Sequence, residues 1–354
     1  MKKIRISKSS RTNFLTYGMV IAAYILLQIM SNSGAISSTL KGQLVPICAY
    51  VVMALSLNLT VGILGELSLG HAGFMSVGAF AGAVSAVALQ TRIPAAGPRL
   101  AAAMLIGALF AGIAGVLIGI PVLRLNGDYL AIVTLAFGEI IKSIINNLYI
   151  GMDGFGLHFS FLNNTITLGE GGRMILSGPM GVPGITKLST FTAGFILILI
   201  SLFVIFNLVN SRAGRAIMAL RDNRIAAESV GISATKYKLM AFVVSAALAG
   251  AAGTLFSLGQ NTIIASKFDF NTSILILVFV VLGGQGRMWG SIVAAAALTV
   301  LPEMLRQFND YRMLVYAIVL ILVMLATNNP TLRIFFSNLC RKLFGFSAKK
   351  GGAQ

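Results

Sequence analysis

The sequence is poor in charged residues and in cysteine. Charged residues make up 10% of its 354 residues, and Asp and Glu together number only 10. Because a soluble domain carries roughly 25% charged residues, this composition excludes an ordinary soluble fold. The two cysteines are expected in different places, Cys48 in a membrane span and Cys340 in an inner tail. No disulfide framework is therefore predicted.

The residue patterns of enzymes are also missing. The chain has 2 histidines, no His, Cys, Asp and Glu cluster with metal-ligand spacing, and no nucleophile beside an evident base. No GxxxxGK[ST] phosphate loop occurs in the sequence. We therefore expect no catalysis, no metal and no cofactor in this chain. If ATP drives its activity, the nucleotide should bind to another polypeptide.

Long apolar runs dominate what is present. Hydrophobic residues make up 57% of the chain, and the mean hydropathy is +0.89. Runs of about 17–25 apolar residues, each able to cross ~30 Å of hydrocarbon, recur from end to end. The sequence thus predicts an all-α polytopic membrane protein with about ten transmembrane helices. These are expected near residues 14–30, 44–63, 72–90, 99–122, 129–149, 190–210, 239–260, 272–283, 289–305 and 313–329.

The basic residues predict the orientation of the chain in the membrane. The formal net charge of +17 lies mainly in the two tails and in one internal loop, which fits orientation in a membrane better than nucleic-acid binding. Both termini are then cytoplasmic, as a basic tail at 1–13 and a second tail at 331–354. The membrane domain covers 14–330 and includes an external loop at 150–188, expected as a small irregular cap, and a cytoplasmic loop at 211–238.

The loop at 211–238 is the most informative segment of the chain. It is polar, carries six basic residues and lies between two runs long enough to span a bilayer. Residues 225–231, IAAESVG, predict a short helix closed by Gly231, because glycine accepts the left-handed turn after a helix. Such a helix suits docking of a partner subunit. The alternative is a solvated loop that follows the positive-inside rule.

Two glycine-rich segments, 62–73 and 282–290, interrupt the spans. Non-helical backbone near membrane depth persists only where protein buries it or water reaches it, so both segments are candidates for lining a pathway. Tight cytoplasmic hairpins are the alternative. Six polar residues near or inside the spans are further candidates for the path or for structural contacts: Asn58, Glu66, Ser68, His71, Glu139 and Lys142.

Three of these six support more specific expectations. Asn58 should form hydrogen bonds between helices. Glu139 and Lys142 lie one helical turn apart and can pair, since an unpaired charge within a membrane costs at least ~2.5–3.5 kcal/mol. His71 is expected to act as a hydrogen-bonding residue rather than as a proton relay.

Several motifs in order resemble one known family. LNLTVGILGELSLGHAGFMSVGA (57–79), PVLRLNGDYLAIVTLAFGEIIKSIINN (121–147) and the segments 214–255, 268–295 and 305–324 are similar to permeases of branched-chain amino acid ABC transporters, in particular the LivM-type subunit. The resemblance implies a type II-like ABC importer permease in the bacterial inner membrane, surrounded by membrane lipid. It also implies a LivH-type second permease, two cytoplasmic ATP-binding subunits and an external substrate-binding protein as partners.

Within this resemblance, residues 225–231 correspond to the loop that couples importer permeases to their ATPases. The residues expected to couple are Arg215, Arg221, Asp222, Ala226, Ala227, Glu228 and Gly231. Ile225 departs from the pattern, because importers generally have Glu there. Two alternative functions stay open: a related importer for nucleosides, sugars, urea or short amides, and an ion-coupled secondary transporter or channel that uses Glu139 and His71.

Overall fold

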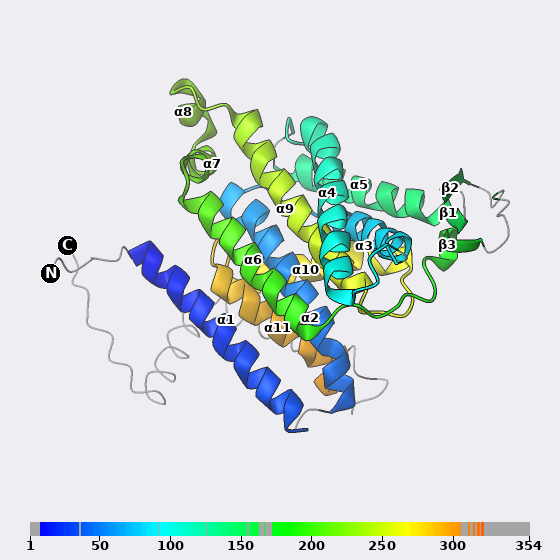
Figure 1. Ribbon diagram of the computed structural model, residues 1–354. Helices are drawn as coiled ribbons and strands as arrows, with labels where there is room; N and C mark the ends of the chain where they lie inside the picture. Colours follow the sequence, from blue (N-terminus) through cyan, green and yellow to red (C-terminus); the bar gives the residue numbers. More distant parts are fainter. Residues whose placement is uncertain are drawn as a thin grey trace. The chain divides into compact units, whose positions relative to one another are not determined.

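Helices form most of the chain in the computed structural model, which describes residues 8–34, 37–90, 92–125, 127–153, 156–162, 166, 172–305, 311, 314–315, 317–318 and 320–321. The chain divides into two units, Met1–Val300 and Leu301–Gln354. Figure 1 shows the elements of the first unit, and their bounds are α1 Lys8–Asn32, α2 Ser38–Asn58, η1 Leu59–Leu64, α3 His71–Ala88, α4 Ala96–Val122, α5 Asp128–Asn146, β1 Leu148–Asp153, β2 Gly156–Phe161, β3 Arg173–Ser177, η2 Gly178–Met180, α6 Phe191–Asn210, α7 Arg212–Asp222, α8 Arg224–Ser229, α9 Ala234–Ser257, η3 Ala265–Lys267 and α10 Phe270–Gly283. The last helix, α11 (Met288–Met304), begins in the first unit.

Eight described segments are helical, long and apolar enough to cross a membrane, and α11 is a shorter apolar helix. They coincide with the first nine predicted spans, with ends that differ by up to seven residues. The tenth predicted span, 313–329, and the tail 331–354 with Cys340 lie almost entirely outside the described residues. In the predicted tail 1–13, the structure begins α1 at Lys8, so the last six residues of that tail are helical.

Small residues bring α3, α4 and α9 together at the centre of the first unit. A Cβ on Gly78 would overlap the backbone of Gly250, and one on Gly107 would overlap Thr254. The Thr254 hydroxyl donates a hydrogen bond to the Gly78 carbonyl over 2.8 Å. Close backbone approach of this kind stabilises helix pairs in lipid, where no hydrophobic force drives helices together.

The outward faces of the helices are apolar. On α4, Leu105, Leu109 and Leu117 are exposed, whereas Gly107 and Ala111 on the other side are buried. This pattern reverses that of a soluble helix, where the apolar stripe faces the core. It fits a helix whose small side packs on protein and whose bulky side contacts lipid.

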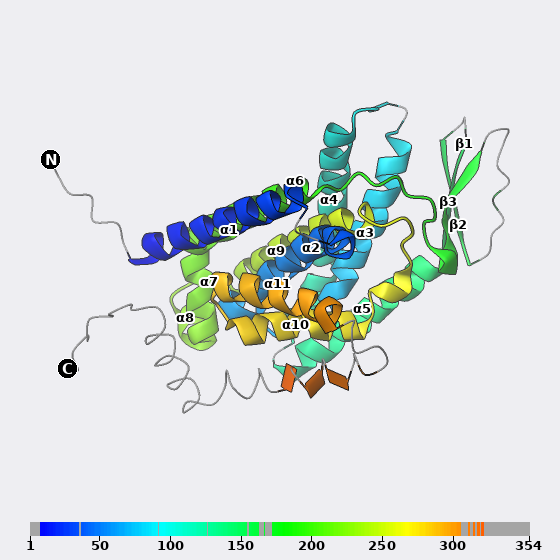
Figure 2. The same ribbon diagram turned by 90° about the horizontal axis from the view of Figure 1, so that it is seen from below.

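The first helix packs along α6. Figures 1 and 2 both show α1 running beside α6. Tyr24 stacks on Phe195 with 4.1 Å between ring centroids, and Tyr17 contacts Phe206 edge-to-face at 5.6 Å. Aromatic pairs of this geometry add ~0.5–1.5 kcal/mol beyond buried area.

The predicted external loop 150–188 differs from the irregular cap expected from its Gly, Asn and Thr content. β1, β2 and β3 form an antiparallel sheet in the order β2-β1-β3, with a register shift between Ile150 and Gly151. Val182 forms a bridge with Ile263, which ties the end of the loop to the segment after α9. The sheet was missed because its short strands carry few β-branched residues.

Candidate functional site

The two glycine-rich segments, predicted separately, lie against each other in the structure. The first begins in η1, a π-helical turn that continues α2, and the second follows α10. The fully buried Asn58 side chain joins them: Oδ1 accepts a hydrogen bond from Gly286 N at 2.8 Å, and Nδ2 donates one to Ser291 Oγ at 2.9 Å. A Cβ on Gly62 would overlap the Gly286 backbone, so this contact requires glycine. π-helical turns inside helices frequently mark functional sites.

Buried hydroxyl groups extend the hydrogen bonds around Asn58 to α3 and α9. We call this buried group of Asn58, Ser291 and the hydroxyl groups near them the polar centre. The Ser56 hydroxyl lies 2.8 Å from His71 Nε2, and the Thr60 hydroxyl donates to Ser245 Oγ over 2.8 Å. The prediction of hydrogen bonds between helices around Asn58 is therefore confirmed, and His71 does act as a hydrogen-bonding residue. Ser68 Oγ and His71 Nδ1 are buried and have no hydrogen-bond partner among the described residues.

An ion pair connects the first glycine-rich segment to the end of the 211–238 loop. The Lys238 ammonium donates to the Glu66 carboxylate, and only 6% of the Lys238 side chain and 12% of the Glu66 side chain are exposed. These residues are 172 positions apart. Sequence reasoning named Glu66 but missed Lys238, because no local spacing links the two. The buried pair gives both charges a partner, which burial requires.

Arg221 makes a second contact between the same two regions. Its Nη1 donates to the Gly62 carbonyl at 3.2 Å, and its Nε and Nη2 donate to Asp222 Oδ1 at 3.0 and 2.9 Å. Its stem also covers Gly65, which ends η1 in the left-handed conformation with φ +80°. A cavity of about 340 Å³ lies at this junction, and it is lined by Leu64, Gly65, Glu66, Leu67, Gly127, Leu220, Arg221, Asp222, Asn223, Arg224 and Lys238.

The predicted short helix is present as α8. Asn223 caps it by accepting a hydrogen bond from Ala226 N at 3.0 Å, as Asn at a helix N-terminus commonly does. Arg224 pairs with Glu228 at 3.0 Å. Gly231 follows the helix in the left-handed region with φ +87°, which confirms the predicted turn. Upstream, Ser211 caps α7, and Arg215 and Asp222 are exposed.

The two alanines of α8 face different surroundings. Ala227 is buried against Leu220 and Ala234, so packing within the chain explains its small size. Ala226 is exposed, and beside it Ile225 and Val230 are 81% and 77% exposed. Three apolar residues, Ile225 and Ala226 on α8 and Val230 at its C-terminal end, are therefore exposed; we call them the α8 strip.

Glu139 and Lys142 form the predicted ion pair on α5. Lys142 Nζ lies 2.9 Å from Glu139 Oε2, and both side chains are partly exposed in this chain. Glu139 also lines a small cavity beside Leu69 and Gly73 of the first glycine-rich segment. The pair thus lies next to the polar centre but is not joined to Asn58 by any hydrogen bond of the described residues.

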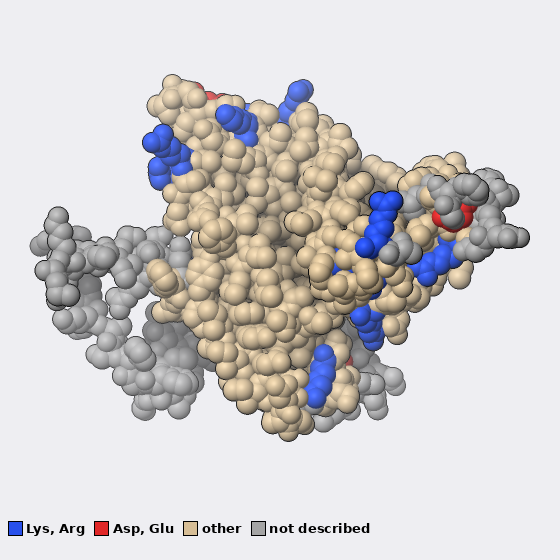
Figure 3. Space-filling view, viewed as in Figure 1, with Lys and Arg blue, Asp and Glu red and all other residues tan. Residues whose placement is uncertain are grey.

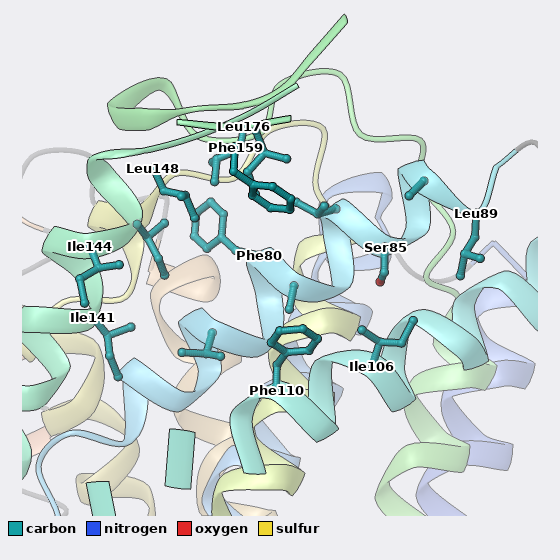
Figure 4. Close-up of a pocket in the computed structure, with 16 residues that line it drawn as sticks. Phe80, Ser85, Leu89, Ile106, Phe110, Ile141, Ile144, Leu148, Phe159 and Leu176 are labelled. Atoms are coloured by element: carbon teal, nitrogen blue, oxygen red, sulfur yellow. The ribbon is translucent and has the colours of Figure 1, made fainter. Parts of the chain in front are cut away.

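One large cavity of the described residues is apolar. It measures about 600 Å³ and lies between α3, α4, α5 and the sheet (Figure 4). Ile106 and Phe110 come from α4, and Ile141 and Ile144 come from α5; Ser85 is the one polar side chain among the sixteen lining residues. With no charged side chain and one hydroxyl group in its lining, this cavity offers a polar solute little to replace its water.

No metal centre is evident in the part of the chain that the structure describes. There, no group of three or more His, Cys, Asp and Glu side chains lies close enough to hold an ion. Cys48 is buried as a free thiol on α2.

The charge distribution and the apolar helices define the class of protein. On the face drawn in Figure 3, Lys and Arg gather over the end formed by α7 and α8 and again toward the opposite end, and a broad band between them shows no charged side chain. Eight described helices are long and apolar enough to cross a membrane. The protein is a multi-pass helical membrane protein, with a polar buried centre where two helix breaks meet.

Sequence comparison identifies the family within this class. Residues 39–324 match the family of permease components of branched-chain amino acid transport systems, and the chain belongs to that family. It is 40% identical over 295 residues to the high-affinity branched-chain amino acid transport permease LivM of Salmonella typhimurium and to that of Escherichia coli. The match covers 78% of this chain and 66% of each LivM protein, so the chain spans about two thirds of the length of these relatives.

More distant relatives transport other solutes. The ribose import permease RbsC of Escherichia coli is 26% identical over 286 residues, which cover 78% of this chain and 81% of RbsC. No solved structure matches the chain.

Proposed function

We propose that this protein is a membrane-spanning permease subunit of an ATP-driven importer that moves branched-chain or other hydrophobic amino acids across the bacterial inner membrane. Membership of the permease family supports the general role, and the 40% identity to LivM proteins supports the substrate class. The chain itself performs no chemistry. ATP is hydrolysed on separate subunits, and their movement is transmitted to the spans.

The observation that carries the proposal is the connection between the 211–238 loop and the polar centre. The Arg221–Gly62 hydrogen bond and the Lys238–Glu66 ion pair both join α7 or α9 to the break that follows α2. An ATPase that pushes on α8 would displace α7 and the start of α9 together, because Ala227 packs on both Leu220 and Ala234. Arg221 and Lys238 would then pull on η1 and open or close the contact that Asn58 makes with Gly286.

The assembly we propose contains a LivH-type second permease, two cytoplasmic ATP-binding subunits and an external substrate-binding protein. The α8 strip is the surface proposed for the ATPase, since the buried core of a protein contact is more apolar than its rim. Both termini and the 211–238 loop then lie in the cytoplasm, and the sheet lies outside.

Uptake by purified proteoliposomes tests the function. The complete assembly with its receptor should accumulate leucine when ATP is present, whereas this chain alone should neither hydrolyse ATP nor move leucine. Accumulation of ribose but not leucine would assign the chain to the sugar importers instead. Robust leucine flux through the isolated chain would contradict a paired permease.

Labelling with an impermeant thiol reagent in intact cells tests the orientation. In a chain without native cysteines, Ala226→Cys on the exposed α8 surface should be protected, and Met180→Cys, exposed in η2, should react. The reverse pattern would contradict the proposed orientation.

A further inference from the structure

A second polar cavity lies at the end of the first unit away from α7 and α8. It has a volume of about 450 Å³, within the ~300–1,000 Å³ range of small-molecule sites. Residues that line it include Gln43, Tyr50, Phe256, Lys267, Asp269 and Thr272. Because α9 starts beside α8 and Phe256 lies 22 residues later, the cavity is separated from the α8 strip by about 33 Å of helix. In the proposed orientation it opens to the outside.

One short turn carries a positive and a negative side chain into the lining of this cavity. The Asp269 carboxylate is fixed in place: Oδ1 accepts from Thr272 N at 2.9 Å and Oδ2 accepts from Asn271 Nδ2 at 3.0 Å. The turn before it is held by a hydrogen bond from the Thr272 hydroxyl to the Lys267 carbonyl, at 2.9 Å. Within the described residues, no ion pair joins Lys267 to Asp269, and no other carboxylate pairs with the Lys267 ammonium. Both charges are therefore available to a ligand.

Two aromatic side chains, Tyr50 and Phe256, also line the cavity. Tyr50 and Phe256 contact each other edge-to-face with 5.8 Å between ring centroids. Pro46 on α2 adds a further apolar side chain to the lining. The cavity therefore combines a carboxylate, an ammonium group and an apolar wall within the dimensions of one small molecule.

We propose that this cavity is an entry site for a zwitterionic α-amino acid with an apolar side chain, at which the external receptor delivers its ligand. The Asp269 carboxylate binds the α-ammonium group, Lys267 binds the α-carboxylate, and the side chain lies against Tyr50 and Phe256. Hydrogen bonds between charged groups are stronger than those between neutral groups. A neutral sugar carries no ammonium group for Asp269 and no carboxylate for Lys267, so it could form neither ion pair. The site deepens the proposed function, on which it rests, by explaining how this subunit distinguishes an amino acid from other solutes.

Two variants remove one charge each while keeping the turn. Asp269→Asn retains a side chain that caps α10 well, and Lys267→Gln keeps a long polar chain. Lys41→Gln is the matched control, because Lys41 is an exposed lysine on the first turn of α2 and does not line the cavity. Equal assembly and thermal stability of the three variants show that any loss comes from the ligand contact.

The measurement is binding of radiolabelled leucine to the complete transporter in nanodiscs without its receptor, together with receptor-dependent leucine uptake. We expect the leucine dissociation constant to rise about tenfold or more in Asp269→Asn and in Lys267→Gln, and to stay unchanged in Lys41→Gln. For the unaltered protein, isoleucine should compete with leucine. 4-Methylpentanoic acid, which lacks the ammonium group, and isoamylamine, which lacks the carboxylate, should compete at least about tenfold more weakly.

The competition series needs no variant, so it decides the proposal even if a variant fails to assemble. Equal competition by the singly charged analogues, unchanged binding in both variants, or no leucine binding by an unaltered transporter that takes up leucine would overturn the entry site and leave the permease function standing. Absence of receptor-dependent leucine uptake by the unaltered assembly would instead overturn the proposed function itself.

Discussion

The buried ammonium group of Lys238 on α9 pairs with the carboxylate of Glu66, which follows the π-helical turn η1. This ion pair and the Arg221–Gly62 hydrogen bond join the polar loop to the interior of the membrane domain. The loop is thus fixed to the glycine-rich segment 62–73. Asn58, just before this segment, accepts a hydrogen bond from Gly286 of the second glycine-rich segment.

Removal of one partner of the Glu66–Lys238 pair should destabilise the protein strongly. Glu66→Gln strands a buried ammonium group, and a broken buried pair costs ~3–5 kcal/mol. The double variant Glu66→Gln with Lys238→Met removes both charges and should recover most of this loss. Thermal unfolding of the purified assembly measures the coupling. Additive losses in the double variant would show that the two residues do not interact.

Loss of the Asn58 side chain should lower the stability of the protein more than loss of the Ser291 hydroxyl. Asn58→Leu leaves the Gly286 amide without its acceptor, and an unsatisfied buried donor costs ~1–3 kcal/mol. Ser291→Ala is the control, because it removes only the Ser291 hydroxyl that Asn58 Nδ2 contacts. The melting temperature should fall in Asn58→Leu by clearly more than in Ser291→Ala. Equal decreases would mean that the contact with Gly286 does not hold the two breaks together.

Gly231 should tolerate asparagine but not valine. A Cβ at this position meets no atom within 4 Å, so space is not limiting, but the left-handed backbone at φ +87° disfavours a β-branched side chain by ~1–2 kcal/mol. Asn adopts this conformation readily. We expect Gly231→Val to insert and assemble with the second permease but to lose receptor-stimulated ATP hydrolysis, which Gly231→Asn keeps. Equal hydrolysis by both variants would remove the turn from the coupling path.

Glu139→Gln should be more harmful alone than together with Lys142→Met. The single change leaves Lys142 without its 2.9 Å partner inside a membrane span, where a charge costs at least ~2.5–3.5 kcal/mol. The yield of folded protein in the membrane is the measurement. If the double variant is no better than the single one, the pair is not coupled, and Glu139 becomes a candidate residue of the transport path.

The helices and their order could be predicted from the sequence because apolar length alone determines a span. The α8 helix and its closing turn were also predictable, since Gly231 and the alanines carry local signals. The side chains that Asn58 and Glu66 contact were not, because Ser291 lies 233 residues from Asn58 and Lys238 lies 172 residues from Glu66. Only the tertiary fold brings such residues together.

Which residues of α8 are buried could not be predicted from the sequence either. Ala226 and Ala227 are identical neighbours, yet one is exposed and the other packs on Leu220 and Ala234. The docking surface that we propose therefore consists of Ile225, Ala226 and Val230, of which only Ala226 was among the predicted coupling residues. The sheet formed by β1, β2 and β3 was missed because these short strands carry few β-branched residues to mark them as strands.

The most direct test of the coupling role is ATPase binding to variants of the α8 strip. Ile225→Asp and Val230→Asp place a charge on exposed positions that no span depends on, and Met180→Asp makes the same change on exposed η2. After purification of the assembly, we expect Ile225→Asp and Val230→Asp to retain the second permease but to lose ATPase association by about tenfold or more, while Met180→Asp keeps it. Normal ATPase association and normal leucine uptake by both α8 variants would show that 211–238 is only a solvated connection between two spans.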